Sequence, residues 1–496
     1  MIFASVIQVV PHRLRAWRLA FTLGLGLAAL PVWPVPAADP PRQYPGLPEG
    51  TTPYDWALEQ LQVPAAHARH RGRPGFVVAV IDLGYRHHPD LEGHLWVNPN
   101  PTRRDVEQRQ DLHGWDFADD DGSLEYNGPQ AESAYYTNHH VFVAGEVAAV
   151  APECRLMILR VSYRNHDSWY QAVDYAVRHG AKVLVMPHGY IGRAPGSEVP
   201  LFYQGTDFTW PEDNPKLRES LDNAYDAGCL VFSGTADNRG RRVAFFPVAS
   251  EAVCAVGSSN RTGEASNMAA DADYVEFSAP AGQRGTADPG QTVWGLGGRQ
   301  DYTSFEGGCM ACSFAGGVAA LVWSRHPEWT NDQLRQVLRN TARGQPRDAH
   351  QSDRKLGYGI LSADEALALT DDQLTRDVRL VADSLKITPC EGGFRLRGTL
   401  HNHGVWDARK AMVVVYNGDP TQPRSSEATL DQPGPELQTR QLGHAVTSVR
   451  GLHESGIAID CAGAAPAKVW FEVYCLDRRS PRIHRLMVNL PAPPTP

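Results

Sequence analysis

The feature that most constrains the fold is a regular alternation of short apolar runs and helical segments between residues 76 and 257. The first run, FVVAVI at Phe76–Ile81, is continuous and β-branched, as is typical of a strand that a parallel sheet buries on both faces. Four further strands are predicted, at Leu156–Val161, Lys182–Met186, Cys229–Phe232 and Ala252–Gly257. Helices are predicted at Asn138–Val150, Trp169–His179 and Pro215–Ala227. This alternation predicts an α/β domain with a doubly wound, mainly parallel sheet and helices on both faces.

The first 37 residues have the pattern of a secretory signal peptide. Three arginines, Arg13, Arg15 and Arg18, precede the apolar run Leu19–Leu30, and small residues follow at Val35–Ala37. The alternative is a membrane anchor, but this run is shorter than the ~20 residues that cross a bilayer. We therefore predict cleavage near residue 37 or 38, a secreted or periplasmic location, and no membrane span once the signal is removed.

The chain changes character near residue 377. A Pro-rich linker is predicted at 38–53 and the α/β domain at 54–369, whereas alternating strands dominate the last part of the chain. These strands, at Phe394–Leu400, Ala411–Tyr416 and Lys468–Tyr474, are separated by Gly, Pro and Asn turns with no helical stretch between them. The pattern predicts an all-β sandwich at 378–492, and the segment resembles immunoglobulin-like modules of secreted bacterial enzymes.

The net charge of the chain indicates which kind of binding partner to expect. The formal charge of −9 becomes −12 when the three arginines leave with the signal peptide, and the remainder holds no basic block. Nucleic acid is therefore not an expected partner.

The eight cysteines are too few for a disulfide framework in 496 residues. Export would allow one bridge among Cys390, Cys461 and Cys475.

Three residues suggest nucleophilic chemistry. Asp82 ends the first buried strand, where open α/β sheets place their sites, and His139 lies near the start of a predicted helix. In the run Gly307–Leu321, GGCMACSFAGGVAAL, the glycines predict a helix that begins close to Cys309, and a helix N-terminus favours a thiolate. Taken singly, Asp82 is equally well explained as an aspartate in a turn, and the segment of Cys309 as a glycine-packed helix whose cysteines are apolar. Together they supply a carboxylate, an imidazole and a nucleophile in one of the known orders.

At this point the sequence resembles the subtilisin-like serine proteases, over about residues 54–367. The segment VVAVIDLGYRHHPDL at Val77–Leu91 matches the Asp motif of that family, and HHVFVAG at His139–Gly145 occupies the position of HGTHVAG. The segment GGCMACSFAGGVAAL aligns without a gap on GTSMASPHVAGVAAL, so that Cys309 takes the place of the nucleophilic serine. The resemblance thus implies a subtilisin-like fold, a protein or peptide substrate, and Asp82, His139 and Cys309 as the catalytic residues.

The resemblance also implies further site residues. Asn238, in ADNRG, falls on the side-chain donor of the oxyanion hole. Pro187, His188 and Gly189 replace the Ser-Leu-Gly of the substrate-binding strand, and Pro187 has no backbone N–H to offer a substrate. Calcium is often bound by this family, but the acidic cluster at 119–121 matches no complete calcium-loop motif, so we assign no metal or cofactor. The sequence makes no prediction of oligomeric state.

Three functions follow from these observations. The first is acyl transfer and peptide-bond hydrolysis by an Asp-His-Cys variant triad, with turnover impaired because sulfur is larger than oxygen. The second is a catalytically inactive pseudoprotease that acts as a binding module, which the changes around the cleft favour. The third is redox chemistry, because Cys309 and Cys312 form a C-x-x-C at a predicted helix N-terminus.

Overall fold

The computed structural model describes most of the chain from residue 44 onward. The described residues are 44–126, 130–188, 214–235, 247–248, 250–272, 274–299, 301–344, 353–375, 378–403, 408–417, 441–449, 452, 454–475 and 483–489. The predicted signal peptide, the first part of the linker, Gly189 and Asn238 lie outside them. None of the helices in the described ranges combines the length and the hydropathy needed to cross a bilayer.

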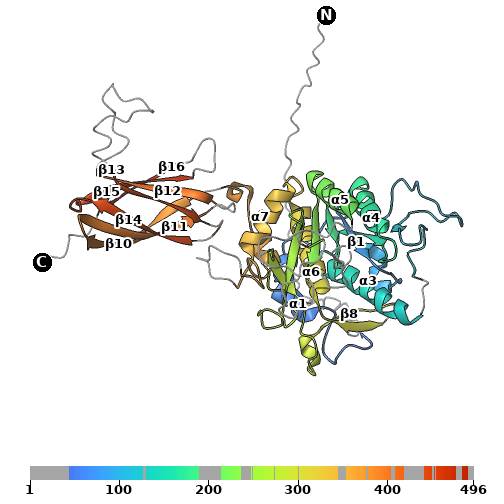
Figure 1. The fold of residues 1–496 in the computed structure, drawn as a ribbon. Coiled ribbons are helices and arrows are strands. Elements are labelled where there is room, and N and C mark those ends of the chain that lie inside the picture. The colour runs from blue at the N-terminus through green and yellow to red at the C-terminus, as the bar shows by residue number, and fades with distance from the viewer. Residues whose placement is uncertain are drawn as a thin grey trace, which may run out of the picture. The chain divides into compact units, whose positions relative to one another are not determined.

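A seven-stranded sheet forms the centre of the first region, residues 44–375 (Figure 1). Its strand order is β2-β3-β1-β4-β5-β6-β7, and every neighbouring pair is parallel. The strands are β1 (Val77–Asp82), β2 (Gly114–Asp116), β3 (Arg155–Arg160), β4 (Val183–Val185), β5 (Leu230–Gly234), β6 (Val253–Ser259) and β7 (Phe277–Pro280). The prediction of a parallel sheet is confirmed, although the short strands β2 and β7 were not predicted.

Alternate side chains of each strand enter two separate cores. In β1, Val78 and Val80 join a cluster with the helices α3 (Gln130–Val150) and α6 (Gly308–Arg325). Their neighbours Val77, Ala79 and Ile81 join a second cluster, which holds side chains of α4 (Asp167–Arg178) and α5 (Pro215–Asp226). Because both faces of the strand are covered, its sequence is continuously apolar rather than alternating. The helices therefore lie on both faces of the sheet, as the alternation predicted (Figure 1).

Helix α6 is the central helix of this region. All of its residues are buried except Cys309 and Arg325, which explains why its sequence is apolar on every side. Shorter elements complete the region. They are α1 (Asp55–Gln60), α2 (Val63–His67), α7 (Asn331–Thr341), α8 (Ala363–Leu367) and the hairpin of β8 (Val293–Leu296) with β9 (Tyr302–Phe305).

The second region, residues 378–489, is all-β and antiparallel. One sheet has the order β10-β11-β14, and the other has the order β13-β12-β15-β16. The strands are β10 (Val378–Cys390), β11 (Gly393–Asn402), β12 (Ala408–Tyr416), β13 (Gln441–Val449), β14 (Glu454–Ala462), β15 (Lys468–Cys475) and β16 (Ile483–Asn489). Buried side chains of both sheets form one apolar cluster, among them Leu396, Ile459, Val413 and Phe471.

The strand order bears on the predicted disulfide of this region. Cys390 lies on β10 and Cys461 on β14, and these strands pair with opposite edges of β11. Two strand spacings amount to about 9.5 Å, beyond the ~7 Å limit for Cα atoms joined by a disulfide. Both thiols are accordingly free, so a bridge between these two cysteines is excluded.

Candidate active site

Two glycines fix the position of Cys309. A Cβ atom added at Gly234, the last residue of β5, would lie 2.1 Å from the carbonyl oxygen of Gly308, and one added at Gly308 would lie 2.3 Å from the carbonyl oxygen of Thr235. The first turn of α6 can therefore rest against the end of β5 only because both residues lack a side chain. This contact places Cys309, the second residue of α6, beside the carboxyl edge of the sheet.

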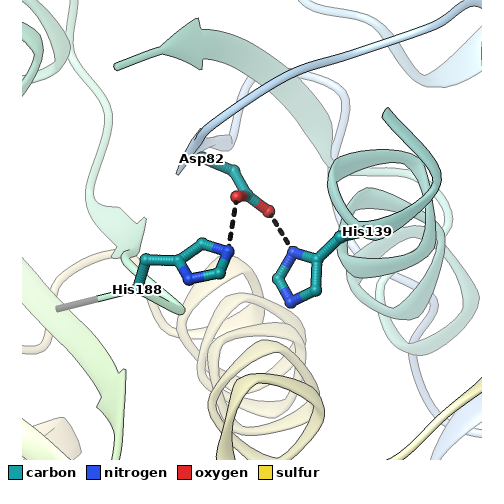
Figure 2. A group of neighbouring side chains, drawn as sticks. All are labelled: Asp82, His139 and His188. Atoms are coloured by element: carbon teal, nitrogen blue, oxygen red, sulfur yellow. Dashed lines mark hydrogen bonds and ion pairs between the residues drawn. The ribbon is translucent and has the colours of Figure 1, made fainter. Parts of the chain in front are cut away.

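Asp82 and His139 form a buried pair at that edge (Figure 2). Asp82 is the last residue of β1 and is fully buried, and His139 lies on α3 with 1% of its surface exposed. Nδ1 of His139 lies 2.8 Å from Oδ2 of Asp82. We assign the proton to Nδ1, because the carboxylate can only accept. This tautomer leaves Nε2 of His139 free to accept a proton, and the nearby Cys309 side chain adds to the rise in the pKa of His139.

A second imidazole contacts the same carboxylate. Nε2 of His188, which follows β4, lies 3.0 Å from Oδ1 of Asp82, although this contact lacks the geometry of a directed hydrogen bond. The rings of His139 and His188 are tilted against each other with their centroids 4.4 Å apart. Figure 2 shows the two imidazoles on either side of the carboxylate, one against each oxygen. We had expected His188 to contact substrate as part of the substrate strand, and its contact with Asp82 was not predicted.

Asp82, His139 and His188 shift one another's pKa values. Burial would raise the pKa of Asp82, but His139 and His188 override it and hold that pKa well below its usual range. Burial would likewise lower the pKa of His139, but the Asp82 carboxylate raises it well above its usual value. For His188, burial and the neighbouring His139 outweigh Asp82, so its pKa is lowered. Asp82 thus stays a carboxylate whose charge favours the imidazolium that forms when Nε2 of His139 accepts a proton, whereas His188 is held neutral.

The Cys309 thiol lines a cavity of about 160 Å³ together with His139 and His188. Its Sγ lies 3.2 Å from the carbonyl oxygen of Pro187, to which it donates its hydrogen bond. Most of the remaining lining residues lie at the end of β5, at the start of α6, and at the end of β9 and just after it. The remaining lining residues are Tyr135, Pro187, Gly234, Thr235, Val248, Arg284, Phe305, Glu306, Gly307, Gly308 and Met310. The structure therefore brings His139, His188, Pro187 and Cys309 together at one cavity, with Asp82 buried in contact with both imidazoles.

Cys312 is placed differently from Cys309. Its side chain is fully buried within the core cluster of α3 and α6, and its thiol donates to the carbonyl oxygen of Cys309 at 3.1 Å. Burial raises the pKa of Cys312 well above its usual value. Both cysteines are free thiols. The buried position of Cys312 does not favour the rapid exchange that a redox C-x-x-C requires.

The acidic cluster does not fit a calcium site. Arg160 donates to both Asp116 and Asp119, Arg103 donates to Asp120, and Arg109 contacts Asp121. Calcium needs six to eight oxygen ligands, whereas these carboxylates are already paired with arginines. The arginines occupy the place that a cation would take.

Glu146 is a buried acid that sequence reasoning did not single out. It lies on α3, one residue after the segment His139–Gly145, is fully buried, and neither carboxylate oxygen makes a hydrogen bond within the described residues. Burial raises the pKa of Glu146 well above its usual value, against the opposing effects of His139 and Ser313. In the sequence, Glu146 stands inside an apolar helical run, and such a run predicts only packing in the core.

The chain is similar in sequence to a known alkaline protease and to a known subtilisin. The chain is 27% identical over 294 residues to a thermostable alkaline protease of Halalkalibacterium halodurans, a match that covers 58% of this chain and 67% of that protein. It is 25% identical over 318 residues to subtilisin BL of Lederbergia lenta, covering 63% of this chain and 97% of that protein.

Solved structures share the fold. A mutant form of the epidermin leader peptide processing serine protease of Staphylococcus aureus superposes with a TM-score of 0.51 at 15% identity and covers 65% of this chain and 82% of that one. A lanthipeptide protease gives a TM-score of 0.50 at 21% identity and covers 64% of this chain and 94% of that one. The α/β region therefore has the predicted subtilisin-like fold. The Subtilase family profile matches residues 73–359, more than half of the sequence, and the chain therefore belongs to the subtilase family of peptidases.

Proposed function

We propose that this protein is an exported subtilase that performs acyl transfer with Cys309 as the nucleophile, His139 as the base and Asp82 as the carboxylate that orients the base. The observation that carries the proposal is the buried 2.8 Å contact between Asp82 and His139, at the wall of a cavity that Cys309 shares. The family acts on protein or peptide substrates, and the ungapped match to its serine motif supports Cys309 in the serine's place.

The proposed chemistry assigns one role to each of these residues, and Asn238 has its role from the match to the family's motif alone. Nε2 of His139 takes the thiol proton as Sγ of Cys309 bonds to the carbonyl carbon of the substrate. The negative charge moves to the carbonyl oxygen, which the backbone N–H of Cys309 and the amide of Asn238 stabilise. The carbonyl re-forms as the leaving group departs with the proton from the imidazolium. Water then attacks the thioester, with His139 again as the base, and releases the acid and the thiol.

Two features limit turnover on peptides. Sulfur forms longer bonds than oxygen, and a displacement of ~1 Å can cost on the order of 100-fold in rate. Pro187 also offers no backbone N–H to a substrate strand. We therefore expect activated esters to react faster than peptide bonds. Subtilases commonly bind calcium, but no step in this scheme needs it.

The proposal also assigns a fold and a role to the all-β region. We assign residues 378–492 to an immunoglobulin-like sandwich that serves as an accessory module, separate from the peptidase domain at 54–369. The two antiparallel sheets with one shared apolar cluster support this assignment.

A non-catalytic binding module is the second candidate. It is favoured by the Cys309 thiol, which donates to the carbonyl oxygen of Pro187. In that case the cavity would bind a peptide without turnover. A redox role for Cys309 and Cys312 ranks third, since Cys312 is buried.

Alkylation of the reduced protein at neutral pH separates these candidates. If His139 activates Cys309, iodoacetamide labels Cys309 faster than it labels free cysteine, and His139→Ala slows the labelling by at least ~10-fold, toward the lower end of general-base effects. Peptide mapping identifies the labelled residue, and Cys254, buried away from the cavity, is the internal reference. Labelling of Cys309 at the rate of free cysteine, unchanged in His139→Ala, would leave the binding module as the better account.

A further inference from the structure

We propose that Asp82, His139 and His188 form a binding site for a divalent transition-metal ion such as Zn²⁺. One potential ligand atom from each of the three side chains lies within 4.8 Å of the other two. They converge from β1, α3 and the segment after β4, so the parallel sheet itself gathers them (Figure 2). The acyl-transfer steps require one imidazole on Asp82, and they do not use the second.

The three side chains are close enough to hold one metal ion between them. The contacts of Asp82 with His139 and His188 are 2.8 Å and 3.0 Å. The two contacts run to different carboxylate oxygens. Ligands at ~2.0–2.1 Å from a tetrahedral zinc stand about 3.3 Å apart, so the two imidazoles must turn from the carboxylate oxygens toward a shared ion. The backbone N–H of Leu83 donates to Oδ1 of Asp82 at 2.6 Å and fixes the orientation of the carboxylate. An anchored carboxylate of this kind orients its metal.

The donor set identifies the class of ion. Two imidazole nitrogens and one carboxylate suit zinc and other borderline transition metals, whereas calcium and magnesium require oxygen ligands. All three side chains are largely removed from solvent, with exposures of 0%, 1% and 12% for Asp82, His139 and His188. His139 and His188 also line the cavity, which can supply a fourth ligand as water or as the thiolate of Cys309.

Metal binding and the peptidase chemistry exclude each other. Nδ1 of His139 must carry a proton to be oriented by Asp82, and it must lose that proton to coordinate a metal. Occupation of the site would therefore remove the base from Cys309. This consequence rests on the proposed function, whereas the metal site itself stands on the geometry of the three side chains.

Calorimetric titration of the full-length reduced protein with ZnCl₂ tests the site without reference to turnover. We expect one tight equivalent in the unmodified protein. His188→Ser removes one ligand but keeps the contact of Asp82 with His139, and it should weaken binding by more than the roughly 10- to 100-fold that follows loss of an outer-shell partner. The matched control is His326→Ala, which disrupts the other described triad of potential ligands, His326, Glu328 and Asp371, and should bind as the unmodified protein does.

Cys309→Ala separates this site from adventitious binding to a thiol. Retention of tight binding in Cys309→Ala, together with its loss in His188→Ser at unchanged melting temperature, supports the proposal. Equal binding in His188→Ser and the unmodified protein would overturn it, as would complete loss of tight binding in Cys309→Ala alone. An inactive protein that binds zinc through His188 would contradict only the peptidase function, and an active protein that binds none would contradict only the metal site.

Discussion

Replacing Asp82 by asparagine is expected to slow acylation of Cys309 by between ~10²- and ~10⁴-fold, the upper figure being typical of such a change in Ser-His-Asp sites. The carboxylate accepts from Nδ1 of His139 at 2.8 Å and contacts Nε2 of His188 at 3.0 Å. An amide replaces one accepting oxygen by an NH2 donor, which favours the wrong tautomer of His139, and it carries no charge to stabilise the imidazolium. Burst amplitude and rate with an activated ester measure the effect.

Asp111→Asn is the matched control for this substitution. Asp111 is also a fully buried aspartate, but it accepts from Tyr175 and Asn98 and does not line the cavity. Both variants should lose stability, whereas only Asp82→Asn should lose acylation. Equal acylation rates in Asp82→Asn and the unmodified protein would mean that Asp82 has no part in orienting the base.

Replacing Glu146 by glutamine is expected to change how stability depends on pH. Burial raises the pKa of Glu146 above its unfolded value, so the folded protein retains a proton that the unfolded chain releases. The protonated Glu146 contributes fully to stability below the unfolded pKa of ~4.3. This contribution is lost as pH rises toward the folded pKa, and the free energy of unfolding falls by up to ~1.4 kcal/mol per pH unit. Glutamine does not titrate and removes this slope.

Urea unfolding between pH 4 and pH 7 measures the difference. Relative to Glu146→Gln, the unmodified protein should lose on the order of 2–3 kcal/mol over this range. Glu153→Gln, at an exposed position, should follow the unmodified protein. Parallel curves for the unmodified protein and Glu146→Gln would show that Glu146 titrates as an ordinary exposed acid.

The sequence was sufficient to predict the α/β sheet because the β-branched run of β1 and the intervening helices leave few other topologies. It also indicated that Asp82 and Cys309 would lie at the same edge, since the carboxyl ends of parallel strands meet there. The edge strands β2 and β7 escaped prediction because three or four residues carry no periodic signal. The all-β character of the last region followed from strand alternation, but the assignment of each strand to one of the two sheets did not.

The parts of the site that escaped prediction depend on tertiary contacts. His188 reaches Asp82 because β4 lies beside β1, and the local sequence does not specify strand order. Cys312 was indistinguishable from Cys309 in a C-x-x-C pattern, but three residues along a helix turn it into the core. The aspartates at 119–121 received no assignment from the sequence, because their arginine partners, distant in sequence, meet them only in the fold.

The most direct test of the central claim is the mass of the intact protein after brief exposure to an activated ester. We predict that the unmodified protein gains one acyl group on Cys309, that His139→Ala gains it far more slowly, and that Cys309→Ala gains none. A protein that remains unacylated, or that is acylated equally fast with and without His139, would contradict the claim that Cys309 is a nucleophile activated by His139.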